Sequence, residues 1–576
     1  MAFKHIFEKK SLTKILAQRD SDDLHGNSLN KILSVRDLTA LGIAAIVGAG
    51  IFSTVGKACF DGGPGVIFLF IITPIVCAFS ALCYAEFASR VPISGSAYTY
   101  SYVAFGEMTA WIIGWALIME YAIGNIVVAI SWSSNLTAFL KSIHIIIPDF
   151  LSSSYFEVKS GNDYFLHPAG TYGGTIPPEQ AHNLWVNAPH LGAIPIILNI
   201  PALVITFFIT WLAFVGIKES RTGSNLMVAF KLIVVIAVIA IGFFYIEPTN
   251  WHPFLPNGMG GVMKGVSAVF FAYIGFDAIS TTAEECKDPQ RDLPRGMLYS
   301  LIACTVIYIL IALVLTGMTK YTNLGSESFL ADAFTSRGMK WLGGIIALSA
   351  VVATTSVMLV FQLGQPRIWM SMSRDGLLPA AFKKVHPKYK TPSFSTIVTG
   401  FLVGVPALVL DSNFVTDLTS IGTLFAFILV CGGILVLNKD KNGPRPKFKV
   451  PYISGRFILP FIFIATIVIF QYASPGTLSS FFDLNAVAKS DNTSVLGAFT
   501  ERIPYFVFLI ICSLMLVFSI LRKLSLIPVM GLLSCFYLMT QLSVTNWAWF
   551  AVWLIIGLVI YFTYGIKHSN LRRPNE

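Results

Sequence analysis

Long apolar windows are the feature that most constrains this chain of 576 residues. A window of about 20 apolar residues can cross a bilayer as a helix, which satisfies the backbone N–H and C=O groups where there is no water. We place fourteen such windows along the chain. They cover 38–58, 66–90, 106–137, 194–217, 225–246, 262–286, 296–319, 341–371, 394–411, 414–438, 456–472, 502–521, 526–543 and 546–566. The pattern predicts an all-α polytopic membrane protein.

Composition agrees with this fold class and argues against a soluble protein. Hydrophobic residues make up 55% of the chain and charged residues 12%, with a mean hydropathy of +0.71. Soluble domains carry about twice that charged fraction. The cysteines are scattered and form no C-x-x-C pair, so we expect no disulfide, no metal site and no cofactor.

Basic residues are distributed as expected for a chain with both termini in the cytoplasm, where Lys and Arg collect in membrane proteins. With fourteen crossings, roughly 30 of the 40 Lys and Arg residues fall on the inner side, including those of the dense loops 374–390 and 439–456. The net charge of +10 therefore reflects topology and anionic lipid, and we expect no nucleic-acid partner. Residues 1–36 predict either a helix on the inner membrane surface or a partly ordered tail.

Two glycines interrupt the first apolar window at bilayer depth. Gly48 and Gly50 loosen the helix and predict unwound backbone, and a second interruption is predicted within 271–277. Unwound backbone at that depth is tolerated only where it lines a cavity or meets a ligand. Two interrupted segments in matching halves indicate the binding site of a secondary transporter. The alternative, close helix packing on small residues, is weakened by the second break.

Three charged residues lie deep in apolar windows and need a reason to be there. They are Glu120, Lys231 and Asp277. A charge near the bilayer centre costs on the order of 3 kcal/mol by insertion scales. All three are expected near one plane, which favours a functional role over pairing for packing alone. Other carboxylates stand near inner window ends and are expected to be solvated there: Glu86, Glu284 and Glu285.

Broken helices offer opposite partial charges, which suit a zwitterion. Helix N-termini favour anions and unwound carbonyls favour cations. The carboxylate of an amino acid could therefore bind the amides after Gly48, and its ammonium the carbonyls around Phe271. Negative charge from Glu120 and Asp277 would suit a side chain that ends in ammonium or guanidinium.

Several short motifs follow one another along the chain. They are Gly48-Ala49-Gly50-Ile51-Phe52, Tyr84-Ala85-Glu86-Phe87-Ala88, 92–98 (Pro-Ile-Ser-Gly-Ser-Ala-Tyr), Glu120-Tyr121, 271–277 (Phe-Ala-Tyr-Ile-Gly-Phe-Asp), 288–294 (Asp-Pro-Gln-Arg-Asp-Leu-Pro), 374–379 (Arg-Asp-Gly-Leu-Leu-Pro) and 420–424 (Ser-Ile-Gly-Thr-Leu). In this order and spacing the chain resembles the cationic amino acid transporter branch of the amino acid–polyamine–organocation superfamily. The resemblance covers residues 36–440 well and the last four windows loosely.

The resemblance implies a LeuT-like fold, in which two inverted repeats of five helices are followed by four extra C-terminal helices. The implied division is a cytoplasmic tail at 1–36, a first repeat at 37–246 with an outer loop at 141–193, a second repeat at 262–438, the last four helices at 456–566 and a cytoplasmic tail at 567–576. Within the family the two breaks hold the substrate, together with acidic side chains. The implied substrate-binding residues are Val47, Gly48, Ala49, Gly50, Glu120, Phe271, Ala272, Ile274 and Asp277.

Lys231 resembles the lysine that proton-coupled members carry in the fifth helix. A buried amine can lose and regain a proton near neutral pH, so Lys231 is a candidate proton carrier. Its alternative role is a fixed positive charge in place of a sodium ion. In the eighth window, Phe361 or Gln362 is expected to face the far end of the pocket. A bulky residue there would disfavour long substrate side chains.

These observations favour a secondary active transporter that imports amino acids with protons, preferentially cationic ones such as arginine, lysine or ornithine. An amino acid or polyamine exchanger, and a proton-coupled permease of neutral or broad specificity, stay open. A membrane enzyme or a sensor is disfavoured, because we see no nucleotide-binding loop, metal cluster or nucleophile elbow. The expected partners are an amino acid, protons and membrane lipid, and an accessory subunit is left open. The compact loops favour a bacterial inner membrane.

Overall fold

The computed structural model describes residues 7–11, 31–48, 50–91, 93, 95–167, 176–325, 329–437, 446–473, 481, 483 and 495–571. These residues are predominantly helical, and their only strands form one short hairpin. The predicted tail 1–36 is described only in part. Its residues 7–11 are not helical, and 12–30 lie outside the described residues.

The elements follow one another in this order. The first part of the chain forms α2 (Val35–Ile46), the π-helix η2 (Gly50–Thr54), α3 (Val55–Gly62), η3 (Gly63–Val66), α4 (Ile67–Arg90), α5 (Ala97–Ala104), α6 (Glu107–Ser142), η4 (Asp149–Leu151), α7 (Tyr155–Leu166), α8 (Pro178–Asn187), β1 (His190–Leu191), β2 (Ile194–Pro195), α9 (Ile200–Val215), α10 (Ile217–Phe243), η5 (Pro248–Trp251), α11 (Gly258–Lys264), α12 (Val266–Tyr273) and the 3-10 helix η6 (Phe276–Glu285). The second part forms α13 (Pro289–Met318), η7 (Tyr321–Asn323), α14 (Phe329–Thr335), α15 (Lys340–Arg374), η8 (Ala380–Lys383), α16 (Ser393–Ala407), α17 (Ser412–Leu437), α18 (Gly455–Ala473), α21 (Val495–Arg522), α22 (Leu526–Thr540), α23 (Val544–Ile560), η9 (Tyr561–Gly565) and α24 (Ile566–His568).

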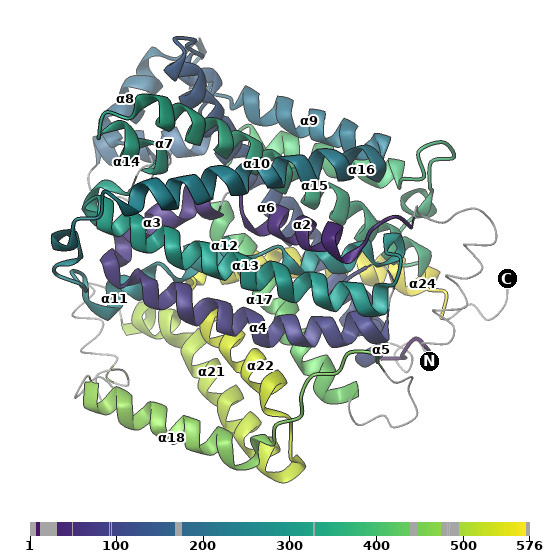
Figure 1. Ribbon diagram of the computed structural model, residues 1–576. Coiled ribbons are helices and arrows are strands. Elements are labelled where there is room, and N and C mark those ends of the chain that lie inside the picture. Colours follow the sequence, from purple (N-terminus) through teal and green to yellow (C-terminus); the bar gives the residue numbers. More distant parts are fainter. Residues whose placement is uncertain are drawn as a thin grey trace.

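The helices agree with a polytopic membrane protein. Among the described residues, nine helical segments are long and apolar enough to cross a membrane, and four shorter apolar helices accompany them. The predicted window 262–286 instead holds α11, α12 and η6. In Figure 1, α7 and α8 lie at the end of the bundle opposite to α5 and α24. We call the end with α5 and α24 the inner end. The count of fourteen crossings, the inverted repeats and the cytoplasmic placement of the termini stay predictions.

The middle of the bundle is formed by α6, α15 and α17. α6 packs against both of the other helices, and 89% of its apolar window is buried. The C-terminal helices α18 and α21 pack against each other and keep large apolar side chains exposed, including Phe457 and Phe461. Such a surface suits lipid tails, which are as apolar as the side chains themselves.

Both predicted helix interruptions are present. α2 ends at Ile46, and the backbone bends at Val47 and Gly48 before η2 begins. α12 ends at Tyr273, and Gly275 follows with φ of 118° before η6 begins. That left-handed conformation is one that glycine adopts without steric cost, and an added Cβ would lie 2.7 Å from the Cβ of Ala45. Glycine is therefore needed at this turn for two reasons, the positive φ and the lack of space for a Cβ.

The predicted outer loop 141–193 contains folded structure. α7 and α8 enclose a small core of their own, and the hairpin of β1 and β2 turns at Gly192, which has φ of 66°. The N–H of Phe156 donates to the carbonyl of Val409 at 3.0 Å, which attaches this unit to the segment after α16. The core residues are Val158, Ala181, Leu184, Ala188 and Ile197.

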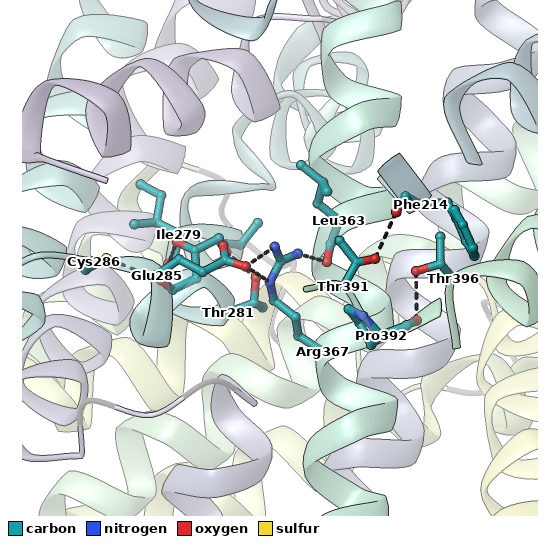
Figure 2. Close-up of polar contacts among 12 residues, drawn as sticks. Phe214, Ile279, Thr281, Glu285, Cys286, Leu363, Arg367, Thr391, Pro392 and Thr396 are labelled. Carbon is teal, nitrogen blue, oxygen red and sulfur yellow. Dashed lines mark hydrogen bonds and ion pairs between the residues drawn. The ribbon is translucent and has the colours of Figure 1, made fainter. Parts of the chain in front are cut away.

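One prediction about carboxylates was wrong, because Glu285 is buried and paired rather than solvated. It is 2% exposed, and the guanidinium of Arg367 donates to it with an Nε–Oε1 distance of 3.1 Å. The same guanidinium also donates to the carbonyl of Leu363 (Figure 2). Because Arg367 lies on α15, far along the chain, its pairing with the end of η6 could not be deduced from sequence.

The two other carboxylates are also held by protein groups. Arg374 donates to both carboxylate oxygens of Glu284, each at 3.0 Å. Glu86 is fully buried, pairs with Arg90 and accepts the N–H of Val450 at 2.9 Å. Glu284 thus joins η6 to α15, and Glu86 joins α4 to the segment before α18, where the sequence predicted contact with water.

The buried pair should be more important for stability than an exposed pair nearby. We expect Glu285→Gln to lower the free energy of unfolding by about 3–5 kcal/mol, because it leaves Arg367 buried without its counter-charge. The exposed pair of Lys447 with Asp288 offers the control. Lys447→Gln should cost less than about 1 kcal/mol. The measurement is thermal unfolding in detergent, and equal shifts for the two variants would contradict this assignment.

Candidate functional site

The two helix breaks lie against each other in the centre of the bundle. α12 packs on η2, and a Cβ added to Gly50 would lie 2.8 Å from the Cα of Ala272. Only glycine allows the two backbones to approach this closely. A Cβ added to Gly48 would instead lie 2.0 Å from a methyl group of Val357 on α15. Ala49 lies outside the described residues.

Tyr308 joins the two breaks, and the sequence analysis missed it. Its hydroxyl lies 2.7 Å from the carbonyl oxygen of Ile46 and 2.8 Å from that of Ala272. It can therefore donate to a carbonyl at the end of either α2 or α12. The last carbonyls of a helix have no partner within the helix, so a buried hydroxyl at this point stabilises both ends. A tyrosine within the apolar sequence of α13 gives no signal of such a role.

Lys231 holds the end of α2 from the other side. It is fully buried, and its ammonium donates to the carbonyls of Ile43 at 3.3 Å, Ala44 at 3.1 Å and Val47. It also donates to the hydroxyl of Ser356 on α15 at 3.0 Å. A cation at a helix C-terminus interacts favourably with the helix dipole. Lys231 therefore fixes the broken first helix to α15 through neutral oxygen atoms.

The two deep carboxylates have different surroundings. Asp277 lies in the first turn of η6, where a negative charge suits the helix dipole. Its carboxylate also accepts a hydrogen bond from the hydroxyl of Tyr121 at 3.3 Å. Glu120 is 3% exposed, and its Oε2 has no hydrogen-bond partner in the described structure. A buried carboxylate oxygen without a partner is costly, which makes Glu120 the stronger candidate to receive a cation.

Phe361 and Gln362 face different neighbours. The ring of Phe361 packs edge-on against Tyr121, with centroids 5.6 Å apart. Gln362 accepts from the amide of Asn125 and donates to the hydroxyl of Thr210, both at 2.8 Å. Gln362 therefore serves to join α6, α9 and α15. Of the two, Phe361 is placed beside the acidic groups, through its contact with Tyr121.

The other predicted site residues surround the breaks and are buried. The carbonyl of Phe271, predicted to receive a substrate ammonium, accepts the N–H of Ile274 at 3.2 Å. A carbonyl has a second lone pair, so this bond leaves capacity for a ligand. Val47, Ala272 and Ile274 are each less than 5% exposed. The structure thus brings together both breaks, Lys231 and the segments that carry Glu120 and Asp277.

Comparisons with known proteins identify the family of this chain. The family model for amino acid permeases matches residues 33–487, and the model for the C-terminus of these permeases matches 524–569. The chain is 34% identical over 569 residues to the branched-chain amino acid permease BcaP of Bacillus subtilis, covering 99% of each chain.

Other relatives are named for different substrates. The methylthioribose transporter of Bacillus subtilis is 37% identical over 472 residues, covering 82% of this chain and 93% of the relative. Cationic amino acid transporter 4 of Homo sapiens is 31% identical over 601 residues, covering 95% of this chain and 89% of the relative. The chain therefore belongs to the amino acid permease family, within the cationic amino acid transporter branch of the amino acid–polyamine–organocation superfamily.

Proposed function

We propose that this permease imports cationic amino acids across the cell membrane and couples their uptake to protons. The observation that carries the proposal is the buried Oε2 of Glu120, which has no partner in the described structure. Asp277 adds a second acidic group in the same region, because its carboxylate accepts a hydrogen bond from Tyr121, the residue that follows Glu120. Two buried carboxylates are best balanced by a substrate that brings positive charge.

The helix breaks offer binding positions for the α-ammonium and α-carboxylate groups that all amino acids share. The carbonyls that end α12 suit the α-ammonium group, and the start of the helix after Gly48 suits the α-carboxylate. Close approach of Gly50 to Ala272 leaves no room for side chains between the two backbones. The head group would therefore be recognised by backbone atoms, while Glu120 and Phe361 distinguish one substrate side chain from another.

Proton coupling is assigned to Lys231. When protonated, its ammonium holds the carbonyls at the end of α2 and the hydroxyl of Ser356. When neutral, the amine has only two N–H donors and no charge, so its hydrogen bonds to the three carbonyls and the hydroxyl become weaker. Loss of a proton to the inside would then release α2 from α15 and favour the inward-open state.

A second candidate is a proton-coupled permease for neutral, branched-chain amino acids. The contact of Phe361 with Tyr121 favours it, because a ring beside the acidic groups would shorten the pocket. The relative BcaP is named for such substrates. In that case Glu120 would bind a proton rather than a substrate cation.

Uptake into proteoliposomes separates these functions. Empty vesicles in sodium-free buffer, with the outside more acidic, are supplied with labelled arginine or labelled leucine. Accumulation of arginine above its equilibrium level supports the leading proposal, and accumulation of leucine alone supports the second candidate. Uptake that requires preloaded amino acid indicates an exchanger, and binding without uptake indicates a sensor.

Bulk at Gly50 should abolish substrate binding. The added side chain of Gly50→Leu would meet the Cα of Ala272 and the hydroxyl of Tyr308, both within 3 Å of the new Cβ. Gly344, also in a helix, has open space around its added Cβ, so Gly344→Leu is the control. We expect binding, measured as thermal stabilisation by substrate, to be lost only in the first variant. Wild-type affinity in Gly50→Leu would contradict the site.

Neutralising Glu120 should affect cationic substrates selectively. We expect Glu120→Gln to weaken arginine binding by about 1–3 kcal/mol more than leucine binding, the range for a hydrogen bond to a charged group. The exposed Glu247 pairs with Arg337 on the surface, and Glu247→Gln should leave both affinities unchanged. Competition binding measures the two affinities. An equal loss for both substrates would make Glu120 a structural residue.

Lys231 should be required for proton-driven accumulation. We expect Lys231→Ala to lose accumulation under an imposed pH gradient while the protein remains folded. Lys231→Arg should fail as well, because guanidinium is effectively never deprotonated in proteins. The exposed Lys320 gives the control Lys320→Ala, which should accumulate substrate normally. If Lys231→Ala still concentrates substrate on protons alone, or if sodium drives the wild type, the assignment fails.

A further inference from the structure

Two described segments, 7–11 near the N-terminus and 569–571 near the C-terminus, meet the C-terminal end of α15. Asp375 follows the last residue of α15 and is 7% exposed. From the N-terminal segment, Lys10 forms an ion pair with its carboxylate. From the C-terminal segment, the N–H of Asn570 donates to the carbonyl of Asp375 at 3.0 Å, and its side-chain amide donates to the carbonyl of Arg374 at 2.7 Å.

A second shared contact lies at Glu107, the first residue of α6. This fully buried carboxylate accepts hydrogen bonds from Tyr102 at 2.9 Å, from Tyr561 at 2.8 Å and from Ser569. Its own N–H donates to the carbonyl of Glu8 at 3.2 Å. The two terminal segments are thus held by the same pair of sites, one on α6 and one on α15.

The docking positions are shaped for the two segments. Gly106 has φ of 103°, and an added Cβ would lie 2.5 Å from the carbonyl oxygen of Phe7. Gly376 has φ of 80°, and an added Cβ would lie 2.2 Å from the carbonyl oxygen of His568. Each segment therefore passes a glycine closely enough to exclude any side chain. Chance contact of loose tails does not explain two such matched approaches.

Tyr98 completes the contact at Asp375. Its hydroxyl donates to the carboxylate at 2.7 Å. Burial, and then the charge of Asp375, raises the pKa of Tyr98 well above its ordinary value, so the phenol remains protonated and continues to donate. Asp375 is therefore held on one side by α5 and on the other by Lys10.

The same end of α15 also closes the inner side of the bundle. Arg374 and Arg367 pair with Glu284 and Glu285 at the end of η6. The carbonyl of Glu285 in turn accepts the N–H groups of Ile32 at 3.0 Å and Leu33 at 2.9 Å, just before α2. The end of η6 therefore contacts both α15 and the segment before α2.

We propose that the two terminal segments form a latch on the inner end of α15 that regulates inward opening of the permease. With both segments docked, α15 is held against η6 and the inner side stays closed. Release of either segment frees the end of α15 and lowers the free energy of opening. The regulatory meaning rests on the proposed transport function, but the latch itself can be measured without transport.

The test uses Cys286 as a native reporter in the full-length protein. This thiol follows η6, is 2% exposed and donates to the carbonyl of Thr282, so opening of the inner side should expose it. Alkylation by N-ethylmaleimide is followed by peptide mass spectrometry, with the fully buried Cys304 of α13 as the internal reference. If opening is fast, the alkylation rate follows the population of the open state.

We expect Lys10→Ala to increase the alkylation rate of Cys286 about three- to fivefold, which corresponds to the free energy lost with one partly exposed ion pair. Asn570→Ala should act in the same direction. Lys9 is exposed. Lys9→Ala removes the same charge as Lys10→Ala, and its alkylation rate should match that of the wild type.

Three outcomes would overturn the latch. They are a wild-type rate in either Lys10→Ala or Asn570→Ala, an equal increase in Lys9→Ala, and a parallel increase at Cys304. The last would show general loosening. Because alkylation needs no substrate, failure of the transport proposal would leave this result intact.

Discussion

Unsatisfied backbone carbonyls at the ends of two broken helices are the constraint on which the rest of this structure depends. A break inside a bilayer leaves polar groups without partners, and each costs several kcal/mol unless something binds it. Lys231 binds three carbonyls at the end of α2. Tyr308 lies between a carbonyl of α2 and one of α12. An apolar substitute at either position would leave these carbonyls without a side-chain partner and lower the stability of the helix ends.

These partners also bear on the change of state that the proposed transport requires. A helix end held by side chains rather than by its own ladder can be released without unfolding the helix. Lys231 binds the break from α10 and Tyr308 binds it from α13, so two different helices hold the ends of the broken helices. If the hydrogen bonds of one residue are lost, those of the other remain. A permease needs this property, since it must open one side while the other remains closed.

The sequence predicted the features that follow from local chemistry. Apolar windows predicted the helices, Gly48 and the segment 271–277 marked the two breaks, and Lys231 lies at the first break as a buried amine. It did not predict contacts between distant segments. Nothing local in the sequence shows that Arg367 faces Glu285, or that Gln362 binds Thr210 rather than facing the far end of the predicted pocket. Those outcomes depend on how long helices are rotated against each other, which packing decides.

Pro366 divides α15 into two arms. Proline has no N–H and so removes one bond from the helical ladder, which makes bending easier at that point. The arm before it carries Ser356 and contacts Lys231, and the arm after it carries Arg374. At 1.5 Å per residue the inner arm is about 12 Å long, so a bend of ~10° would move its tip by ~2 Å. That displacement exceeds the tolerance of a hydrogen bond, so a slight hinge motion at one proline is enough to part Arg374 from Glu284, while the contact of Ser356 with Lys231 stays in place.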